Sequence, residues 1–272
     1  MIIVKFQGRL GNQMFQYAAA LCISKKFNTF FLIDNSSKSV LLKYFKNRIL
    51  HGEFLNRILL KWFKKRIRNT ICQIGDEDIT EMKKLFSDNT YYNGFFQSED
   101  YFEGYKSYLQ KRFVIKEKYK AVFNAKYSQL FNENKIIAIH CRLGDYLSWG
   151  SEALGGENLT VPQSYYQNAL SQIDKVESYK VIIVTDDIQN VANRFNFIVD
   201  KMIVSEEEII DFQILQNAHK LIISNSSFSW WAACLNTKKA TIYAPKYWLG
   251  FKVEKEFPIG ILSENFIKIP VY

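Results

Sequence analysis

The sequence lacks any apolar run that approaches the roughly 20 residues needed to cross a lipid bilayer. Its first residues, MIIVK, enter a strand pattern directly and lack the basic start, apolar middle and small-residue cleavage site of a signal peptide. No C-x-x-C pair occurs among the four cysteines, Cys22, Cys72, Cys141 and Cys234. Three of them sit in apolar runs, so we expect buried free thiols instead of a metal or disulfide framework. These absences together predict a cytoplasmic protein.

Acidic residues are scarce in the first 70 positions, which hold 14 Lys and Arg but only 2 Asp and Glu. The net charge of +9 therefore has its source in this part of the chain. Within it, residues 57–69 place five cations on one side of a helix, Arg57, Lys61, Lys64, Lys65 and Arg68, and four apolar residues on the other, Ile58, Leu59, Trp62 and Phe63. Such a helix either packs into a core with a solvated basic face or associates with the inner face of an anionic membrane. No recognised nucleic-acid motif accompanies the charge, so we expect no nucleic-acid partner.

Several common motifs are also missing. Gly8 and Gly11 fit neither G-x-G-x-x-G nor a P-loop, and no G-x-S-x-G indicates hydrolysis. His51 and His219 have no His or Cys at metal-ligand spacing. Asp76-Glu77-Asp78 looks like the D-x-D of metal-dependent sugar transferases, but this acidic segment opens a helix, where carboxylates favour the dipole. We therefore expect no metal ion and no cofactor.

The chain shows short β-rich runs that alternate with amphipathic stretches of helical length, which is typical of α/β domains with parallel sheets. A length of 272 residues suits two domains, and a polar break at Asn132-Glu133-Asn134 divides them into 1–132 and 133–272. Strands are expected at 2–6, 29–34, 136–141, 180–185, 221–224 and 240–244. Helices are expected at 12–27, 55–68, 77–86, 99–112, 116–131, 164–175, 187–195, 206–219 and 228–236. In the second half, strand, loop and helix recur three times, as in a nucleotide-binding domain.

Polar loops follow four of these strands: QGRLGNQ at 7–13, HCRLGDY at 140–146, TDD at 185–187 and SNSSFSWW at 224–231. Ligands of parallel α/β sheets bind at the carboxyl ends of the strands, where loops lead into helix N-termini. We therefore expect the functional site to be built from these loops. The first of them carries Arg9, Asn12 and Gln13 on a backbone that its glycines let approach a ligand closely.

Arg142 follows a buried strand and is suited to clamp a phosphate, because its planar fork donates paired hydrogen bonds and keeps its charge. Asp145 either holds that guanidinium or acts on the substrate, and a purely structural Arg–Asp pair is the alternative. Asp187 is placed to cap a helix, whereas Asp186 is placed to accept hydrogen bonds from a base or ribose. Ser224-Asn225-Ser226-Ser227 opens a helix and is expected to bind phosphate there, with a simple Ser N-cap as the alternative.

Five segments together resemble glycosyltransferase family 11, the inverting bacterial α-1,2-fucosyltransferases: GRLGNQMFQYA (8–18), GFFQSEDYF (94–102), HCRLGDYL (140–147), VTDD (184–187) and SNSSFSWWAACL (224–235). The resemblance spans nearly the whole chain. It implies a GT-B-like α/β fold, in which an N-terminal acceptor-side domain and a C-terminal donor-side domain, both Rossmann-like, face each other across a cleft. It also implies metal-independent transfer of L-fucose from GDP-β-L-fucose to the 2-hydroxyl of a galactose-type acceptor, a galactoside oligosaccharide or a lipid-linked surface glycan.

The resemblance also implies roles for individual residues. Arg142 grips the donor diphosphate with His140 beside it, and either Asp186 or Asp187 reads guanine or ribose. The pyrophosphate-side helix start matches Ser226, Ser227 and Phe228, and the loop that closes over fucose and acceptor matches Gly11, Asn12 and Gln13. The family often has H-x-R-R-x-D, but its second arginine is Leu143 here, which leaves Arg142 as the only cation of the motif.

An inverting displacement also asks for a base near the acceptor hydroxyl. Asp145 and Glu152 are the nearby carboxylates, and we expect Asp145 to serve, with an orienting role as the alternative. Two other functions stay open at this point. One is transfer of another GDP-deoxysugar by the same fold, and the other is a basic membrane- or nucleic-acid-binding module without catalysis.

Overall fold

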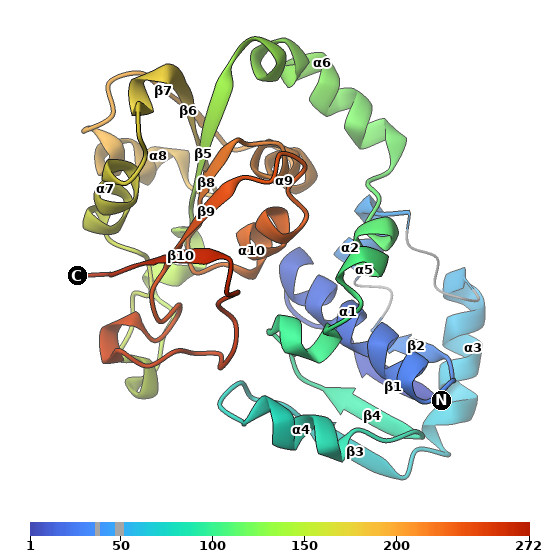
Figure 1. The fold of residues 1–272 in the computed structure, drawn as a ribbon. Helices are drawn as coiled ribbons and strands as arrows, with labels where there is room; N and C mark the ends of the chain where they lie inside the picture. Colours follow the sequence, from blue (N-terminus) through green and yellow to red (C-terminus); the bar gives the residue numbers. More distant parts are fainter. Residues whose placement is uncertain (36–38, 47–51) are drawn as a thin grey trace. The chain divides into compact units, whose positions relative to one another are not determined.

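The computed structural model describes residues 1–35, 39–46 and 52–272 (Figure 1). It divides into two compact units, which we call unit 1 (Met1–Lys116 with Pro258–Ile261) and unit 2 (Glu117–Phe257 with Leu262–Tyr272). Each unit contains one parallel β-sheet with helices packed on it, which confirms the expected α/β fold class. Within the described ranges, no helix is both long and apolar enough to cross a membrane.

Unit 1 has a four-stranded parallel sheet in the order β2-β1-β4-β3. Its strands are β1 (Ile2–Lys5), β2 (Phe31–Asp34), β3 (Asn69–Cys72) and β4 (Thr90–Asn93), and its helices are α1 (Leu10–Lys26), α2 (Val40–Tyr44), α3 (Gly52–Lys64), α4 (Ile79–Leu85) and α5 (Lys106–Arg112). Helix α1 begins at Leu10, earlier than expected, so Gly11 lies in its first turn. Strands β1 and β4 are neighbours in the sheet although β2 and β3 lie between them in the chain, so the loops that follow β1 and β4 leave adjacent strands.

Unit 2 has a six-stranded parallel sheet in the order β10-β9-β8-β5-β6-β7. Its strands are β5 (Lys135–Cys141), β6 (Tyr179–Thr185), β7 (Lys201–Val204), β8 (Lys220–Ile222), β9 (Thr241–Pro245) and β10 (Phe266–Ile269), and its helices are α6 (Glu117–Glu133), α7 (Gln163–Ser171), α8 (Ile188–Val191), α9 (Glu208–Gln216) and α10 (Ser227–Cys234). This is the strand order of a doubly wound dinucleotide-binding sheet, whose order reverses between β5 and β8. The nucleotide-binding pattern expected for the second half is therefore present.

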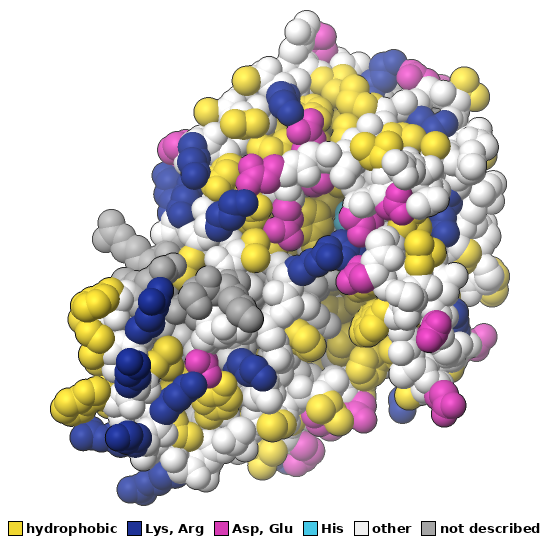
Figure 2. Space-filling model, turned by 180° about the vertical axis from the view of Figure 1, so that it is seen from behind, with side chains coloured by type: hydrophobic (Ala, Val, Ile, Leu, Met, Phe, Trp, Pro, Cys, Tyr) yellow, Lys and Arg dark blue, Asp and Glu magenta, His cyan; other side chains and the backbone are white. Residues whose placement is uncertain are grey.

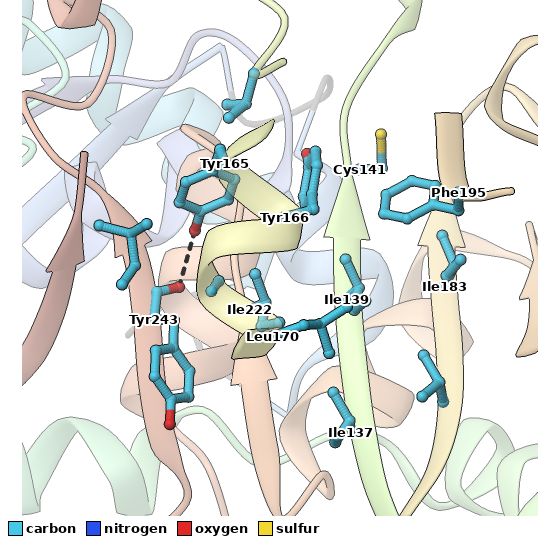
Figure 3. Packing of buried hydrophobic residues seen from close by; sticks show 14 of the residues in the cluster. Ile137, Ile139, Cys141, Tyr165, Tyr166, Leu170, Ile183, Phe195, Ile222 and Tyr243 are labelled. Carbon is cyan, nitrogen blue, oxygen red and sulfur yellow. Dashed lines mark hydrogen bonds between the residues drawn. The ribbon is translucent and has the colours of Figure 1, made fainter. Parts of the chain in front are cut away.

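One core cluster of unit 2 lies between its sheet and helix α7 (Figure 3). Tyr165 and Tyr166, both fully buried, project from α7 toward the strands, where they meet aliphatic side chains such as Ile139. The hydroxyl of Tyr165 donates to the carbonyl oxygens of Ile223, at 2.5 Å, and Tyr243, at 3.1 Å. Because a buried hydroxyl needs a partner, these bonds fix the helix against the ends of β8 and β9.

Helix α6 belongs to unit 2, so the division falls between Lys116 and Glu117 and not at residue 132. The amide of Gln213 on α9 donates to the carbonyl of Tyr119 at 3.2 Å, and the hydroxyl of Tyr127 donates to Glu206 at 2.8 Å. The polar break at Asn132-Glu133-Asn134 is therefore the turn between α6 and β5 inside one unit. Cys22 and Cys141 are buried as expected, whereas Cys72 is exposed on the solvent face of β3.

Candidate active site

The carboxyl end of β5 delivers His140 and Arg142 to the point where the strand order of unit 2 reverses. His140 is the sixth residue of the strand and is buried at 5% exposure. Its Nδ1 atom lies 2.8 Å from Oγ of Ser224, in the loop after β8. Burial, with a smaller effect from the Arg142 charge, lowers the pKa of His140 to about 3. The imidazole is therefore neutral at physiological pH and joins two neighbouring strand ends through a hydrogen bond.

Arg142 is held between two carboxylates. Its Nε and Nη2 atoms donate to Oδ1 of Asp145 at 3.1 and 2.5 Å, and its Nη1 atom lies 3.1 Å from Oδ2 of Asp186. The side chain is 13% exposed, so it reaches the surface along one edge. A guanidinium has five N–H donors. The hydrogen bonds to Asp145 use the Nε–H group and one N–H group of Nη2, whereas Nη1 forms an ion pair with Asp186. The other N–H groups of the guanidinium can contribute to binding an anion.

The two carboxylates are not equivalent. The side chain of Asp145 is 56% exposed, whereas that of Asp186 is 25% exposed and also accepts a hydrogen bond from the backbone N–H of Leu143 at 2.9 Å. Asp186 therefore contacts both the guanidinium and the backbone of the β5 loop. Gly144 makes room for this arrangement, because a Cβ atom there would lie 2.4 Å from Oδ2 of Asp186. That Asp186 or Asp187 reads a base or ribose stays a prediction.

Leu143 occupies the place of the family's second arginine, and its side chain is 1% exposed within the core of unit 2. At this position the chain supplies packing and one backbone N–H instead of a second charge. The motif of this chain therefore has one arginine, Arg142, and its guanidinium is oriented by Asp145 and Asp186.

Tyr146 is a further member of the site that sequence reasoning did not single out. The Cζ atom of Arg142 lies 5.6 Å from the centroid of its ring, a cation–π distance, and its hydroxyl donates to the carbonyl of Asn225 at 3.2 Å. It therefore connects the guanidinium to the loop after β8. The only signal in the sequence is an aromatic residue four positions after the arginine, a spacing that has no meaning until the loop conformation is known.

The loop after β8 leads into helix α10. Ser226 occupies the N-cap position, yet its hydroxyl makes no capping bond, so the simple Ser N-cap does not explain this residue. Instead, the backbone N–H of Ser226 donates to the carbonyl of Ser224 at 2.8 Å, which turns the chain sharply. Phe228, in the first turn with Ser227, lies 5.5 Å from the His140 ring, centroid to centroid. The start of α10 is thus packed directly against the end of β5.

Asp187 has the capping role that the sequence offered as an alternative. Its carboxylate accepts from the backbone N–H and the side-chain amide of Asn190, at 3.2 and 2.7 Å, at the start of α8. These hydrogen bonds lower the pKa of Asp187. The structure therefore brings together His140, Arg142, Asp145, Asp186 and the start of α10, with Asp187 at their margin.

The polar loop of unit 1 is braced in a similar way. Gly8 has φ of +72°, and a Cβ atom there would lie 2.2 Å from Nδ2 of Asn12. The amide of Gln97 donates to Oδ1 of Asn12 at 2.6 Å, and that of Gln16 donates to the carbonyl of Gly94 at 3.0 Å. The GFFQSEDYF segment that follows β4 thus lies against the loop that follows β1. Gln97 is a second residue that sequence reasoning did not assign.

The three residues expected to face substrate in this loop differ in exposure. Asn12 is half-buried, but Gly11 and Gln13 are buried. The side chain of Gln13 donates to the carbonyl of Gly8 at 3.2 Å and accepts from the N–H of Leu41 at 3.1 Å. Gln13 therefore supports the loop, and Asn12 is the side chain of this set that reaches the surface.

The acidic segment before α4 uses its carboxylates locally. Glu77 accepts from the backbone N–H groups of Ile74 and Gly75 at 2.6 and 2.7 Å, and Asp78 caps α4 by accepting from Glu81 at 2.9 Å. His219 accepts from the N–H of Ile136 at 3.1 Å, whereas His51 lies outside the described residues. In the part of the chain that the structure describes, no group of three or more His, Cys, Asp or Glu residues is placed to hold a metal ion.

The family model described as "Glycosyl transferase family 11" matches residues 1–259. The chain belongs to glycosyl transferase family 11. The matched residues include the polar loop of unit 1 and the loops after β5, β6 and β8 of unit 2. The resemblance drawn from the five motifs is thereby confirmed.

Two relatives from Escherichia coli share about a quarter of their residues with this glycosyl transferase family 11 chain. The alignment with an α-1,2-colitosyltransferase is 298 residues long and shows 27% identity. It covers 98% of this chain and 98% of the relative. The O-antigen biosynthesis glycosyltransferase WbnK is 26% identical over 283 residues, covering 89% of this chain and 92% of the relative. Both names describe glycosyltransferases.

Solved fucosyltransferase structures share the fold of this family 11 chain. NodZ, an α-1,6-fucosyltransferase of Bradyrhizobium soaked with GDP-fucose, matches with a TM-score of 0.56 and 15% identity over 86% of this chain and 92% of its own. FUT1 of Arabidopsis thaliana, in complex with GDP, matches with a TM-score of 0.55 and 10% identity over 89% of this chain and 69% of its own. The GT-B-like fold class expected from the sequence is therefore confirmed.

Proposed function

We propose that this chain transfers L-fucose from GDP-β-L-fucose to the 2-hydroxyl of a galactose-type acceptor, with inversion and without a metal ion. The acceptor oxygen forms a bond to the anomeric carbon, the bond from that carbon to the β-phosphate oxygen breaks, and the hydroxyl proton is released. Family membership and the fold of solved fucosyltransferases support this reaction. The relative named as an α-1,2-colitosyltransferase supports the linkage.

The observation that carries the proposal is the guanidinium of Arg142, fixed at the reversal point of the unit 2 sheet by Asp145 and Asp186. Negative charge accumulates on GDP as the glycosidic bond breaks, and a positioned cation lowers the energy of that state. The N–H groups of Arg142 that do not donate to Asp145 can contribute to binding the diphosphate. We therefore assign the GDP-sugar to unit 2 and the acceptor to the loops of unit 1.

The neighbours of Arg142 have supporting roles in this reaction. The start of α10 offers backbone N–H groups at the positive end of a helix, which favours the second phosphate. His140 is neutral, so it adds no positive charge and supports the phosphate-side loop through Ser224. Phe228 excludes water from this side of the imidazole.

Asp145 serves in this proposal as a positioning residue and not as the base. Its Oδ1 atom receives two N–H groups of Arg142, which commits the carboxylate to the guanidinium. In a loose transition state, the acceptor hydroxyl becomes acidic only after the leaving group has largely departed. A late proton transfer to solvent or to a weak base then suffices.

The experiment that tests the proposal is turnover of GDP-β-L-fucose with a panel of β-galactosides, followed by determination of the linkage. We expect an α-1,2-fucosylated product and a requirement for a free 2-hydroxyl. The matched control is the 2-deoxygalactoside of the best acceptor, which we expect to be inert. Transfer to any other hydroxyl, or hydrolysis of the donor alone, contradicts the proposal.

A second donor is favoured by one observation, the relative named as an α-1,2-colitosyltransferase that aligns over 98% of this chain. The same fold and the same arginine serve a different GDP-deoxysugar equally well, because the clamp contacts the diphosphate and not the sugar. Competition between GDP-fucose and GDP-colitose at equal concentration decides between them. WbnK, named for O-antigen biosynthesis, makes a surface glycan or its lipid-linked precursor the first acceptor to include in the panel.

A further inference from the structure

Helix α3 is fixed to unit 1 by one side of its surface. Asn56 is fully buried, and its amide donates to the carbonyl of Ile33 at 2.8 Å while its Oδ1 atom accepts from the N–H of the same residue at 3.0 Å. Leu60 packs into the cluster of Met1, Ile3 and Leu32. Strand β2 lies at the edge of the sheet, so Asn56 binds the N–H and C=O groups of Ile33 on the side where β2 has no neighbouring strand. Asn56 and Leu60 therefore fix the rotation of α3 on unit 1, and the opposite, outward side of the helix faces solvent.

That outward side carries an apolar stripe. Phe54, Leu55, Ile58 and Trp62 are 76%, 48%, 41% and 69% exposed. At about 100° per residue they fall within one quarter to one third of the helix circumference. Core packing, the first alternative raised by the sequence, explains Leu59, Leu60 and Phe63, which contact the cluster beneath. It leaves Ile58 and Trp62 without an apolar environment.

A basic stripe runs beside the apolar one. Residues 54–75 contain six cations and no acidic residue: Arg57, Lys61, Lys64, Lys65, Arg66 and Arg68. Lys64 is used internally, since its Nζ atom lies 2.8 Å from Oδ2 of Asp34. Among the described residues, Lys61 and Lys65 make no ion pair with an acid. Figure 2 shows Lys and Arg side chains next to hydrophobic ones on the side of unit 1 where α3 lies in Figure 1.

The two stripes meet at a surface hollow lined by Ile58, Lys61, Trp62, Lys64, Lys65 and Arg66. We propose that α3 binds the surface of an anionic lipid bilayer. Trp62, Phe54 and Ile58 enter the interfacial region, and Lys61 and Lys65 contact lipid phosphates at the hollow. This inference does not rest on the proposed function, because it concerns a surface of unit 1 that carries none of the residues assigned to the transfer.

The composition of the surface favours lipid over nucleic acid as its partner. A phosphate backbone is bound by cations with aromatic side chains that stack on bases. The exposed Leu55 and Ile58 have no function in such binding, whereas aliphatic and aromatic side chains beside cations are what an interfacial helix presents to a membrane. Exposed apolar area of this kind is costly in water unless a partner covers it.

The experiment is co-sedimentation of the full chain with vesicles of phosphatidylglycerol and phosphatidylcholine, compared with phosphatidylcholine alone. Each cation near an anionic bilayer strengthens binding roughly fivefold. We therefore expect binding to the anionic vesicles, weakened by salt, and a loss of at least about tenfold in Lys61→Glu/Lys65→Glu. We expect a comparable loss in Ile58→Ser/Trp62→Ser. All four side chains are exposed, so thermal unfolding should not change.

Matched controls change the same residue types elsewhere. Lys238→Glu/Lys255→Glu removes the same charge from exposed positions of unit 2, and Val122→Ser/Val199→Ser removes exposed apolar side chains there. Both should bind vesicles as the unmodified chain does. Quenching of tryptophan fluorescence by brominated lipid should disappear in Trp62→Phe while binding persists. Equal binding of the α3 variants and the controls, quenching that survives Trp62→Phe, or salt-sensitive binding to RNA in place of vesicles overturns the proposal.

Discussion

The Nδ1 atom of His140 and the Oγ atom of Ser224 lie 2.8 Å apart, although 84 positions separate the two residues in the chain. This bond joins the end of β5 to the loop after β8, where the strand order of unit 2 reverses. In unit 1, the bond between Gln97 and Asn12 joins the segments that follow β4 and β1, which are neighbouring strands of the sheet. In open α/β sheets ligands bind at the carboxyl ends of the strands, so each unit supports its polar loops where a ligand is expected.

The first prediction concerns the guanidinium itself. Arg142→Ala should fold and should lower kcat on the order of 100- to 1000-fold, because a positioned charge at the leaving group is lost. Arg142→Lys keeps the charge but loses the fork that contacts Asp145 and Asp186 and that we propose binds the diphosphate. Its kcat should therefore lie between that of Arg142→Ala and that of the unmodified chain. The measurement is steady-state turnover of GDP-fucose, with the unfolding temperature as control. An alanine variant that retains more than about a tenth of the activity excludes the phosphate-clamp role.

The second prediction compares the two carboxylates that hold Arg142. Asp186 also fixes the N–H of Leu143 and is the less exposed, so Asp186→Ala should lower kcat about 10- to 100-fold by misplacing the guanidinium. Asp145→Asn should lose only a few-fold and should keep the shape of the pH–rate profile. Loss of the acidic limb of that profile in Asp145→Asn, where a general base becomes protonated, would instead identify Asp145 as the base. Ser148→Ala, an exposed change in the same loop, is the control.

The third prediction uses the low pKa of His140. The pKa is about 3 in the folded chain but about 6.5 when unfolded, so the unfolded state binds more protons between these values. Stability contributed by the neutral imidazole is therefore complete above pH 6.5 and is lost as the pH falls toward 3. The loss approaches about 1.4 kcal/mol per pH unit within that window. Chemical denaturation of the unmodified chain and His140→Gln should show a smaller pH slope in the variant.

One outcome of this measurement would contradict the prediction for His140. Identical slopes for the two chains mean that His140 titrates alike in the folded and unfolded states, which the burial of its ring does not allow. The same low pKa predicts that no limb of the pH–rate profile above pH 5 arises from this residue.

The fourth prediction concerns metal removal. Glu77 and Asp78 are engaged with backbone N–H groups at the start of α4, so the D-x-D segment has a structural role. Turnover of GDP-fucose should therefore survive excess EDTA unchanged, and Asp76→Asn should be as active as the unmodified chain. Activity that EDTA abolishes and Mn²⁺ restores would return the D-x-D segment to the mechanism.

Residue patterns predicted the strands that are long or strongly apolar, such as β5 and β6, because strands buried on both faces read as continuous runs of Ile and Val. They missed β3, β4, β7 and β10, which are four residues long and each include at least one polar residue. Asn69–Cys72 buries only one of its four side chains. Such segments become strands through pairing with neighbours that are distant in sequence, and local propensity carries little of that information.

The candidate site shows the same limit. The sequence placed Arg142, Asp145 and Asp186 at strand ends, but the contact between Arg142 and Asp186 depends on strand register. His140 pairs with Val184 and Cys141 with Thr185, and this register brings Arg142 and Asp186, the residues that follow β5 and β6, side by side. Tyr146 and Gln97 were missed for the same reason, since each acts through a partner that only the fold brings near.

The last prediction separates backbone strain from a steric clash at Gly8. Both Gly8 and Gly104 have positive φ, +72° and +77°, but a Cβ atom at Gly8 would lie 2.2 Å from Nδ2 of Asn12, whereas at Gly104 nothing lies within 4 Å. Gly104→Ala should therefore cost only the strain of a left-handed backbone, roughly 1 kcal/mol of unfolding free energy. Gly8→Ala adds displacement of Asn12 and of its bond to Gln97, so it should be less stable and should raise the KM for the acceptor. If both variants lose the same stability and keep the same KM, the position of Asn12 does not depend on Gly8, and the steric role assigned to this glycine is wrong.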